Sequence, residues 1–532
     1  MVDKGVIAST ENSCFKIKNT ALSDVRWTRG FWKDRMDICH ENSIYDMWKI
    51  IKEPGISHIY NNFLIAAGLE EGEHQGPGWN DGDFYKWMEA AIVVYAQTED
   101  KELVKLLDVI IDVLDKTQRE DGYIHTPVLI KQQNGEKVEE FNSDMDFETY
   151  NMGHLMTTAC IHHRVTGKEN LLDIACQAAD YLWKVFNNDP QILAENALCP
   201  AHYMGVIELY RTTGKSRYLD LGINLLEIRD LIDEGTDHNQ DRIPFRKQQK
   251  AVGHAVRANY LYAGVADIYA ETGDESLLSS LKRIWEDVVS TKMYITGACG
   301  ALYDGVSPDG TSYNPQEIQQ VHQAYGRPYQ LPSITAHNES CATIGSILWN
   351  WRMFKLQPQA KFMDIIERTL YNGLLAATDL DGQKYLYTNP LRVARDLPFD
   401  LRWSDQRKKF IECYCCPPNI VRTIAEVNNM VYSISENGIW INLYGGSVLE
   451  TELTDGSKIK LKQETDYPWS GEIKILVITA PPEEISLNLR IPDWAQNVSI
   501  AVNGKKVDKS PESGKYFRIN KKWSQGDLIE LN

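Results

Sequence analysis

Two short stretches of the chain concentrate the residue types that bind metals. The segment ECYCCPPN (412–419) places three thiols in close succession, and the segment NESC (338–341) adds a carboxylate and another thiol. Three thiolates and one carboxylate suit a tetrahedral Zn²⁺ site. We therefore predict Zn²⁺ as the cofactor. The predicted ligands are Glu339, Cys341, Cys415 and Cys416, with Cys413 as a further donor.

Both stretches precede a helical pattern. Apolar residues recur at helical spacing after the first, at Ile344, Leu348 and Trp351, and after the second, at Ile420 and Ile424. The thiols are therefore expected at helix N-termini, where the helix dipole favours thiolate over thiol. The alternative is that these cysteines are small hydrophobic core residues. Two clusters combined with a carboxylate favour the metal site.

The region from residue 80 to residue 430 reads almost entirely as helices. Turns that begin at Thr98, Thr166, Thr213 and Thr272 each follow one amphipathic pattern and precede another. Helix pairs at such a period predict a solenoid or a closed α/α toroid. An irregular helical bundle is the alternative.

Three histidines fall in register with this repeat. His154, His202 and His254 each lie near the start of a predicted helix. Equivalent helix starts line one rim of a toroid, so these residues are candidates for substrate binding, although a single histidine is more often structural. Asp83 is a further candidate for binding a substrate hydroxyl, and its alternative role is in an acidic first helical turn.

Glycine and proline interrupt the helical pattern in residues 296–335. Such a long irregular stretch in a compact domain is often functional, so we expect a loop or lid before Glu339. The stretch contains Glu317, His322 and Gln323, all of which carry groups that could contact a substrate.

The pattern changes after about residue 431, where short alternating runs such as ISLNLRI (485–491) are separated by turn residues. This pattern predicts an antiparallel β-sandwich. The expected organisation is an irregular segment 1–24, a helical catalytic domain 25–431 and a β-sandwich 432–532.

Composition limits the functional classes. The chain has 532 residues, which is too many for one ordinary core, and a net charge of −18, which disfavours a nucleic-acid partner. No apolar run is long enough to span a membrane, and residues 1–20 lack the apolar core of a secretory signal. The ten cysteines lack the spacing of a disulfide scaffold. We therefore expect a cytoplasmic protein, unless a signal has been removed.

The segments AYGRPYQLPSITAHNESCATIGSILWNWRM (324–353) and CYCCPPNIVRTIAEV (413–427) resemble glycoside hydrolase family 127, the β-L-arabinofuranosidases, and the related family 146. Further similar segments are NNFLIAAGLEEGE (61–73), WNDGDFYKWMEAA (79–91), YNMGHL (150–155), GHAVRANYLYAG (253–264), YLYTNPLRV (385–393) and QETDYPW (463–469). The resemblance runs from about Val25 to Asn532. Family members usually continue further, which leaves open that the chain is truncated after Asn532.

The resemblance implies a mainly α fold, with an (α/α)6 barrel as the catalytic domain followed by the β-sandwich. In that family a zinc-bound cysteine is the nucleophile of a retaining hydrolase, and this role corresponds to Cys415. The remaining zinc ligands correspond to Glu339, Cys341 and Cys416. Tyr387, in a similar segment, is expected to hold the nucleophile or the sugar through its hydroxyl.

The sequence departs from the family at the catalytic acid/base. Family members carry a glutamate sixteen residues before the zinc-binding glutamate, where this chain has Gln323. An amide cannot protonate a leaving alkoxide, and losing such help costs about 10²–10⁴-fold in rate. Three explanations remain open: an inactivating substitution, a weak hydrolase or a binder, or a proton from Glu317, His322 or a carboxylate of the substrate. We favour divergence towards an altered substrate.

Three functions therefore compete. The first is a retaining hydrolase of β-L-arabinofuranosides or a related furanoside. The second is a zinc-stabilised carbohydrate-binding protein with little or no turnover. The third is a sugar epimerase or isomerase, which the thiol cluster argues against. The expected partner is a glycoside or plant-type oligosaccharide, with no nucleic acid and no membrane, and we allow for a homodimer.

Overall fold

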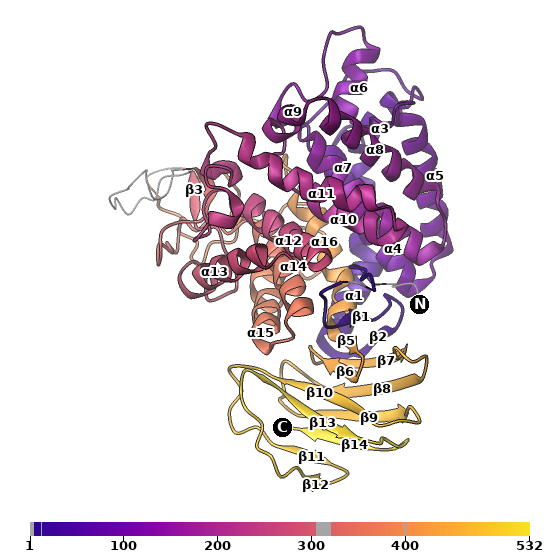
Figure 1. Ribbon diagram of the computed structural model, residues 1–532, viewed down its shortest axis with the longest axis vertical. Helices are drawn as coiled ribbons and strands as arrows, with labels where there is room; N and C mark the ends of the chain where they lie inside the picture. The colour runs from indigo at the N-terminus through magenta and orange to yellow at the C-terminus, as the bar shows by residue number, and fades with distance from the viewer. Residues whose placement is uncertain (1–4, 12, 305–320, 398–400) are drawn as a thin grey trace.

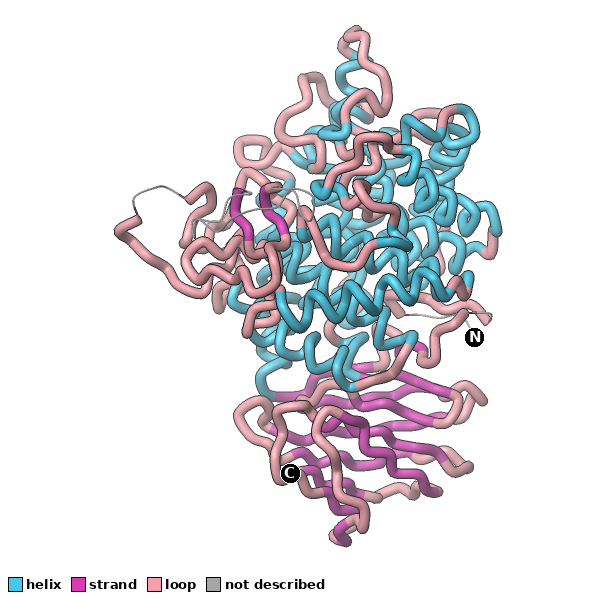
Figure 2. The backbone as a smooth tube through the Cα atoms, turned by 60° about the vertical axis from the view of Figure 1, so that its left-hand side comes forward, coloured by secondary structure: helices cyan, strands magenta, loops and turns pink. Residues whose placement is uncertain are grey.

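The computed structural model describes residues 5–11, 13–304, 321–397 and 401–532. Helices form the larger part of the molecule and strands form a separate layered part beside it (Figures 1 and 2). The predicted fold class, a mainly α barrel followed by a β-sandwich, is confirmed. Across the described ranges, no helix combines the length and apolar character needed to cross a bilayer.

Six inner helices form a closed ring. They are α4 (Asn80–Thr98), α7 (Glu148–Thr166), α10 (His202–Thr213), α12 (Ala255–Thr272), α14 (Ser340–Leu356) and α16 (Cys416–Glu426). Each packs against the next, and α16 packs back against α4. Because other helices cover both of their sides, polar as well as apolar residues of these helices are buried, as along the whole of α14. Their N-terminal ends all point to one rim of the barrel.

Outer helices pair with the inner ones. They are α1 (Gly30–Ile38) and α2 (Ile44–Ile51) beside α16 and α4, then α5 (Lys101–Thr117), α8 (Asn170–Asn188), α11 (Ser216–Glu227), α13 (Glu275–Thr291) and α15 (Ala360–Arg368). These helices are amphipathic: α5, for example, buries Leu103, Leu107 and Ile110 and exposes its charged residues. The shorter helices are α3 (Ile59–Ala66), α6 (Thr126–Gln133), α9 (Pro190–Glu195) and α17 (Asn428–Val431).

The β-sandwich consists of two sheets. One has the order β1 (Lys18–Asn19), β5 (Tyr432–Ser435), β6 (Gly438–Ile441), β10 (Ile485–Ile491) and β13 (Lys515–Lys521). The other has the order β12 (Lys505–Lys506), β11 (Ile500–Val502), β14 (Leu528–Leu531), β9 (Ile473–Thr479), β8 (Lys458–Thr465), β7 (Gly446–Glu452) and β2 (Val25–Arg29). Pairing is antiparallel except between β6 and β10, which run parallel. Alternate residues of β8 are buried, as the sequence pattern predicts.

The N-terminal residues differ from the sequence prediction of an irregular segment 1–24 and a barrel that begins at residue 25. Strand β1 pairs with β5, and β2 pairs with β7, so both belong to the sandwich. The alternation of buried and exposed residues in Val25-Arg-Trp-Thr is typical of a strand, and the partner strand lies far away in the sequence.

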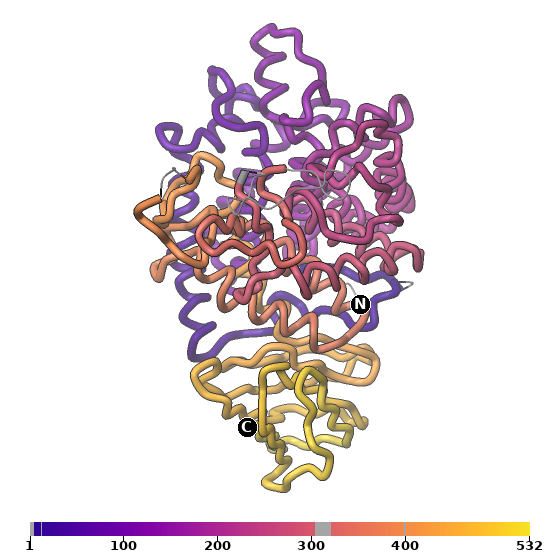
Figure 3. The backbone as a smooth tube through the Cα atoms, turned by 90° about the vertical axis from the view of Figure 1, so that its left-hand side faces the viewer, coloured from indigo at the N-terminus to yellow at the C-terminus, as the bar shows by residue number. Residues whose placement is uncertain are grey.

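Part of the predicted loop 296–335 forms a two-stranded ribbon. Strand β3 (Leu302–Asp304) pairs with β4 (His322–Ala324), which contains Gln323. The loops that precede α14 and α16 come together on one face of the barrel (Figure 3), where Leu391 and Arg392 donate backbone hydrogen bonds to the Ser333 carbonyl. Glu317, a predicted catalytic residue, lies outside the described residues.

Candidate active site

The predicted metal ligands meet at the starts of two adjacent inner helices. Glu339 precedes α14 and Cys341 lies in its first turn, while Cys415 precedes α16 and Cys416 opens it. One donor atom from each of these four residues lies within 4.8 Å of the others. Cys341 and Cys416 are buried, and Cys415 is partly exposed.

The donor spacing fits a tetrahedral ion. Cys415 Sγ lies 3.8 Å from Cys416 Sγ and 3.6 Å from Glu339 Oε1, which is itself 3.7 Å from Cys416 Sγ. Bonds of about 2.3 Å to sulfur and about 2.0–2.2 Å to oxygen, at tetrahedral angles, would separate two sulfurs by about 3.8 Å and sulfur from oxygen by about 3.6 Å. The distances among Cys415, Cys416 and Glu339 therefore match those of a tetrahedral metal site, and Cys341 Sγ lies within 4.8 Å of these three donor atoms.

Burial gives these groups unusual acidities. It raises the pKa of Glu339 to about 8 and that of Cys341 to about 12, and it also raises the pKa of Cys416 well above its ordinary value. Glu339 Oε2 is buried and has no hydrogen-bond partner among the described residues. A bound dication would compensate these costs, because it favours the deprotonated form of every donor.

Tyr387 connects the metal cluster to Gln323. Its hydroxyl lies 3.8 Å from Cys415 Sγ, 3.7 Å from Cys413 Sγ and 3.5 Å from Gln323 Nε2. Its ring stacks on that of Trp403, with 3.8 Å between the ring centres. The stacking fixes the direction of the hydroxyl, which lies between the thiols and the amide.

A cavity of about 330 Å³ opens over the cluster. It is lined by Trp79, Met145, Phe147, Tyr150, Cys199, His254, Val256, Arg257, Tyr260, His322, Gln323, Glu339, Cys341, Tyr387, Arg402, Trp403, Cys413 and Cys415. Aromatic faces for stacking, polar groups and two partly exposed thiols, Cys413 and Cys415, thus surround a space large enough for a sugar.

Comparisons with known proteins identify the family of the chain. The catalytic-domain model of the GH127 β-L-arabinofuranosidases matches residues 24–429, and the middle-domain model of the same family matches residues 438–532. The chain belongs to glycoside hydrolase family 127. As a member of this family it is a glycosidase.

Relatives of this family 127 chain are similar over nearly its whole length. A non-reducing end β-L-arabinofuranosidase of Bifidobacterium longum subsp. longum is 30% identical, over 96% of this chain and 81% of that protein. A solved glycoside hydrolase is 47% identical with a TM-score of 0.86, over 99% of this chain and 80% of that one. The GH127 β-L-arabinofuranosidase Ara127N of Geobacillus stearothermophilus T6 is 33% identical with a TM-score of 0.83, over 95% and 81%.

His254 reaches the cavity because the backbone before it turns sharply. Gly253 has a φ of +71°, and a Cβ atom on it would lie 1.4 Å from the Asp237 carbonyl oxygen, so only glycine fits there. The carbonyl of Gly253 accepts a hydrogen bond from Tyr325 N, at 2.9 Å, which ties the start of α12 to the end of β4. His254 thus stands beside the ribbon that carries Gln323.

Gln323 is held in a costly backbone conformation. Its φ is +57°, in the left-handed region that non-glycine residues seldom adopt, and its side chain is largely buried in the cavity wall. Such conformations cost about 1 kcal/mol or more and persist where the surrounding structure imposes them. The amide of Gln323 lies near the Tyr387 hydroxyl, with 3.5 Å between Nε2 and the oxygen.

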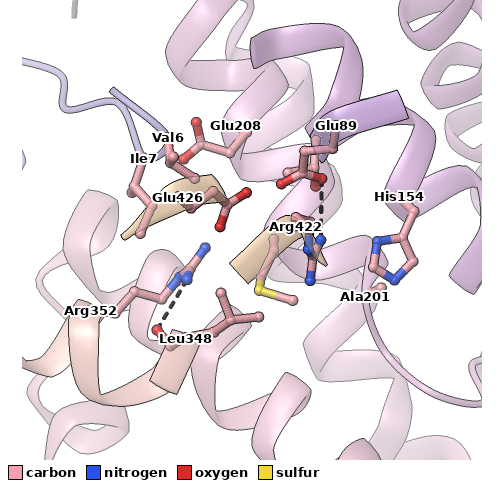
Figure 4. Close-up of a pocket in the computed structure, with 12 residues that line it drawn as sticks. Val6, Ile7, Glu89, His154, Ala201, Glu208, Leu348, Arg352, Arg422 and Glu426 are labelled. Carbon is pink, nitrogen blue, oxygen red and sulfur yellow. Dashed lines mark hydrogen bonds and ion pairs between the residues drawn. The ribbon is translucent and has the colours of Figure 1, made fainter. Parts of the chain in front are cut away.

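Three predicted substrate-binding residues do not line this cavity. His202 is fully buried against Tyr203, and burial lowers the pKa of its ring to about 3. His154 lies one helical turn further along α7 than Tyr150, which lines the large cavity, and His154 itself lines a separate small cavity (Figure 4). Helix register explains the difference, because most residues that line the cavity precede an inner helix or lie in its first turn, and Tyr260 reaches it from the second turn of α12.

Asp83 lies behind the metal cluster and does not line the cavity either. Its carboxylate lies 3.0 Å from Lys86 Nζ, and both residues are fully buried. Lys86 also donates a hydrogen bond to Tyr150 and approaches the carbonyl of Cys415 at 3.4 Å. Burial raises the pKa of Asp83 to about 7. The ion pair thus supports the start of α16 from inside the barrel.

Sequence reasoning missed the two arginines of the cavity, Arg257 and Arg402, and the aromatic residue Trp403. Arg257 stands three residues after His254 on α12, so the next helical turn after a predicted site residue could have indicated it. Arg402 and Trp403 lie in an irregular stretch with no periodicity, and nothing in the local sequence assigns them to the cavity.

Proposed function

We propose that this family 127 glycosidase is a retaining hydrolase of β-L-arabinofuranosides or related furanosides, and that Cys415 is its nucleophile within a Zn²⁺ site. The observation that carries the proposal is the Glu/Cys₃ cluster of tetrahedral dimensions at the base of a sugar-sized cavity. The β-L-arabinofuranosidases among its relatives support the substrate class. A glycoside or plant-type oligosaccharide would be the natural partner.

Exposure supports Cys415 as the attacking thiolate. Cys415 lines the cavity and is partly exposed, whereas Cys416 is fully buried and does not line it. Cys341 lines the cavity but is buried in the first turn of α14. Among the thiols of the predicted metal ligands, Cys415 is therefore the one that a substrate in the cavity would meet first. Cys413 is also partly exposed and lines the cavity, but it is not one of the four predicted ligands.

The proposed reaction has two displacement steps. Cys415 Sγ attacks the anomeric carbon while the bond to the leaving oxygen breaks, which gives a glycosyl group on the cysteine. Water then attacks the same carbon, the carbon–sulfur bond breaks, and the sugar leaves with its original configuration. When bound, Zn²⁺ would keep the thiols deprotonated at neutral pH and make Cys415 a better leaving group in the second step.

Tyr387 and Gln323 orient the reacting groups in this proposal. The Tyr387 hydroxyl can donate to the Cys415 thiolate, 3.8 Å away, or to a sugar oxygen. Gln323 contacts the glycosidic oxygen through its amide without transferring a proton. Efficient turnover then requires either a leaving group that departs without protonation or a proton from another acid.

Metal analysis tests the cluster. Protein purified without added zinc should contain about one zinc per chain, and Cys341→Ser should lose most of it, because one of four donors is removed. Cys160→Ser is the matched control, since Cys160 is also buried on an inner helix but lies away from the cluster. Absence of zinc from the parent, or unchanged zinc in Cys341→Ser, would reject the site.

A furanosyl electrophile that labels the nucleophile tests the assignment of Cys415. Peptide mapping after labelling should find the adduct on Cys415, because that thiol faces the cavity. An adduct on Cys416 or Cys341 would move the nucleophilic role to that residue. Hydrolysis of an aryl β-L-arabinofuranoside by the parent, with retained configuration, completes the test.

A second candidate function is carbohydrate binding with little turnover. It is favoured by Gln323, because among the described residues that line the cavity the only carboxylate is the predicted metal ligand Glu339. An aryl furanoside that binds but is not cleaved would support this candidate over the hydrolase.

A further inference from the structure

The charges on the cavity wall are unbalanced. Of the described residues that line it, Arg257 and Arg402 are cationic, and the one carboxylate, Glu339, belongs to the predicted metal cluster. None of the ion pairs within the described ranges includes either arginine. A sugar-sized cavity therefore presents two guanidinium groups without a carboxylate partner from the described part of the chain.

Arg257 is the more informative of the two, because it is 4% exposed yet lines the cavity. Its Nη1 lies 2.9 Å from the ring nitrogens of His238, and the described residues provide no further hydrogen bond to its guanidinium. Within the described ranges, the remaining N–H groups of the guanidinium are therefore available to a ligand. Guanidinium binds a carboxylate through two parallel hydrogen bonds, which a neutral hydroxyl cannot match.

The surroundings of Arg257 place it beside the reacting groups. The ring of His238 lies 4.9 Å from that of His322, which immediately precedes Gln323. His254, one helical turn before Arg257, forms a backbone bridge with Ala324, which immediately follows Gln323. Arg257 therefore belongs to the same wall of the cavity as the amide that replaces the family acid.

Arg402 extends the positive charge to the exposed side of the cavity. It is exposed, and its guanidinium carbon lies 4.8 Å from the centre of the Trp403 ring. Trp403 in turn stacks on Tyr387. An anion that enters past Arg402 would thus move from an exposed cation to a buried one.

We propose that the natural substrate carries a carboxylate and that Arg257 binds this group, with Arg402 contributing at the entrance. This inference rests on the proposed hydrolysis of furanosides and specifies their class as carboxylated furanosides. Gln323 fits the same requirement, since a glutamate at that position would bring a negative charge next to the bound carboxylate, whereas an amide does not repel it.

Two aryl furanosides that differ only in charge test the proposal. One is 4-nitrophenyl β-L-arabinofuranoside, and the other is its analogue with the C5 hydroxymethyl group oxidised to a carboxylate. The parent should have a kcat/KM at least about 10-fold higher for the carboxylated compound. Arg257→Met should lower the ratio of the two kcat/KM values by about 10- to 100-fold, the range for a hydrogen bond to a charged group.

Two further variants control the measurement. Arg257→Lys keeps the charge without the fork and should restore part of the ratio. Arg217→Met removes an exposed arginine on α11, far from the cavity, and should leave the ratio as in the parent. A third substrate, a 4-carboxyphenyl β-L-arabinofuranoside, places the carboxylate on the leaving group and separates recognition there from recognition on the sugar.

The alternative role for Arg257 is to balance the charge of the thiolate cluster. In that case Arg257→Met would lower kcat/KM for all three substrates by the same factor, and the unchanged ratios would overturn the proposal. A parent that prefers the neutral furanoside would also overturn it. If the parent cleaves none of the compounds, the proposed function fails, and calorimetric binding of the same compounds by the parent and Arg257→Met gives the ratio that decides the inference.

Discussion

Two cavities lined by described residues of the inner helices differ in how their charges are paired. The cavity at the helix N-termini has a volume of about 330 Å³ and contains the thiols, Arg257 and Arg402. The deeper one has a volume of about 20 Å³, enough for about one water molecule, and is lined by five of the inner helices and by Val6 and Ile7 (Figure 4).

In the deep cavity the charged groups compensate one another. Glu89 pairs with Arg422 at 3.2 Å, and Arg352 pairs with Asp267. Burial raises the pKa of Glu426 well above its ordinary value, which favours the uncharged form of this carboxyl group. Glu208, on the same wall, pairs with two arginines, Arg164 and Arg211.

The N-terminal residues close this end of the barrel. The carbonyl of Val6 accepts a hydrogen bond from Arg164, and that of Ile7 accepts one from Lys355. Cys14 and Lys16 donate backbone hydrogen bonds to the last turns of α12 and α14. The deep charges are thus sealed from solvent and paired, as a structural network requires.

Pairing within the chain thus distinguishes structural from functional buried charges in this barrel. Buried charges that have found partners within the chain hold the helices together. Buried charges at the rim that have no carboxylate partner among the described residues, like Arg257, keep their capacity for a ligand. Three experiments can break or sharpen this distinction.

The largest effect is expected from Arg422→Met. Glu89 would lose its cation while staying buried, which costs about 3–5 kcal/mol in the free energy of unfolding. The control Arg217→Met breaks an exposed pair with Asp180 and should cost at most about 1 kcal/mol. Urea unfolding measures both values. If both substitutions lower the free energy of unfolding by the same amount, the buried ion pairs of the deep cavity contribute no more to stability than an exposed pair.

A smaller effect is expected from Gln323→Glu at the rim. An acid at this position can protonate the leaving oxygen, so cleavage of an alkyl arabinofuranoside should rise by about 100-fold or more, while cleavage of an aryl one with a good leaving group changes little. Steady-state kinetics on both compounds give the comparison. Rapid cleavage of the alkyl compound by the parent, abolished in Glu317→Gln, would show that Glu317 is the acid and Gln323 a bystander.

The smallest effect concerns His154 in the wall of the deep cavity. Burial lowers its pKa well below the ordinary value of about 6.5, so the unfolded chain binds more protons than the folded one as the pH falls below about 6.5. His154 therefore costs stability progressively on acidification, by about 1 kcal/mol between pH 6.5 and 5.5. His154→Asn should remove this part of the pH dependence.

Unfolding in urea at pH 7 and pH 5.5 measures the effect. His163→Asn, on the same helix but partly exposed, is the control. A large rise in KM for His154→Asn, with an unchanged pH dependence of stability, would return His154 to the substrate-binding residues that the sequence analysis predicted.

Much of this architecture could be read from the sequence. The Thr turns at the ends of α4, α7, α10 and α12 indicated the helix pairs, because the chain must end each inner helix and reverse its direction at the same level of the barrel. The ligand cluster could also be predicted, since thiols immediately before two apolar helical patterns must lie at helix starts. Alternation of apolar residues fixed the strands after residue 431, because a half-buried strand has a period of two.

Other features were decided only by tertiary structure. The strands β1 and β2 pair with partners more than four hundred residues away, which no local pattern specifies. His154 and His254 both lie near helix starts. His254 precedes its helix and lines the rim cavity, whereas His154 lies in the second turn of its helix and lines the deep cavity.

The pairing of charges was equally invisible in the sequence. Arg257 and Arg422 both lie on inner helices and both are buried, but only Arg422 has a carboxylate partner in the described structure. Whether a buried cation is neutralised depends on which helices the closed ring makes neighbours. Residue type and spacing therefore determined the chemistry this chain carries, and the packing of the ring decided which of its charges remain available to a substrate.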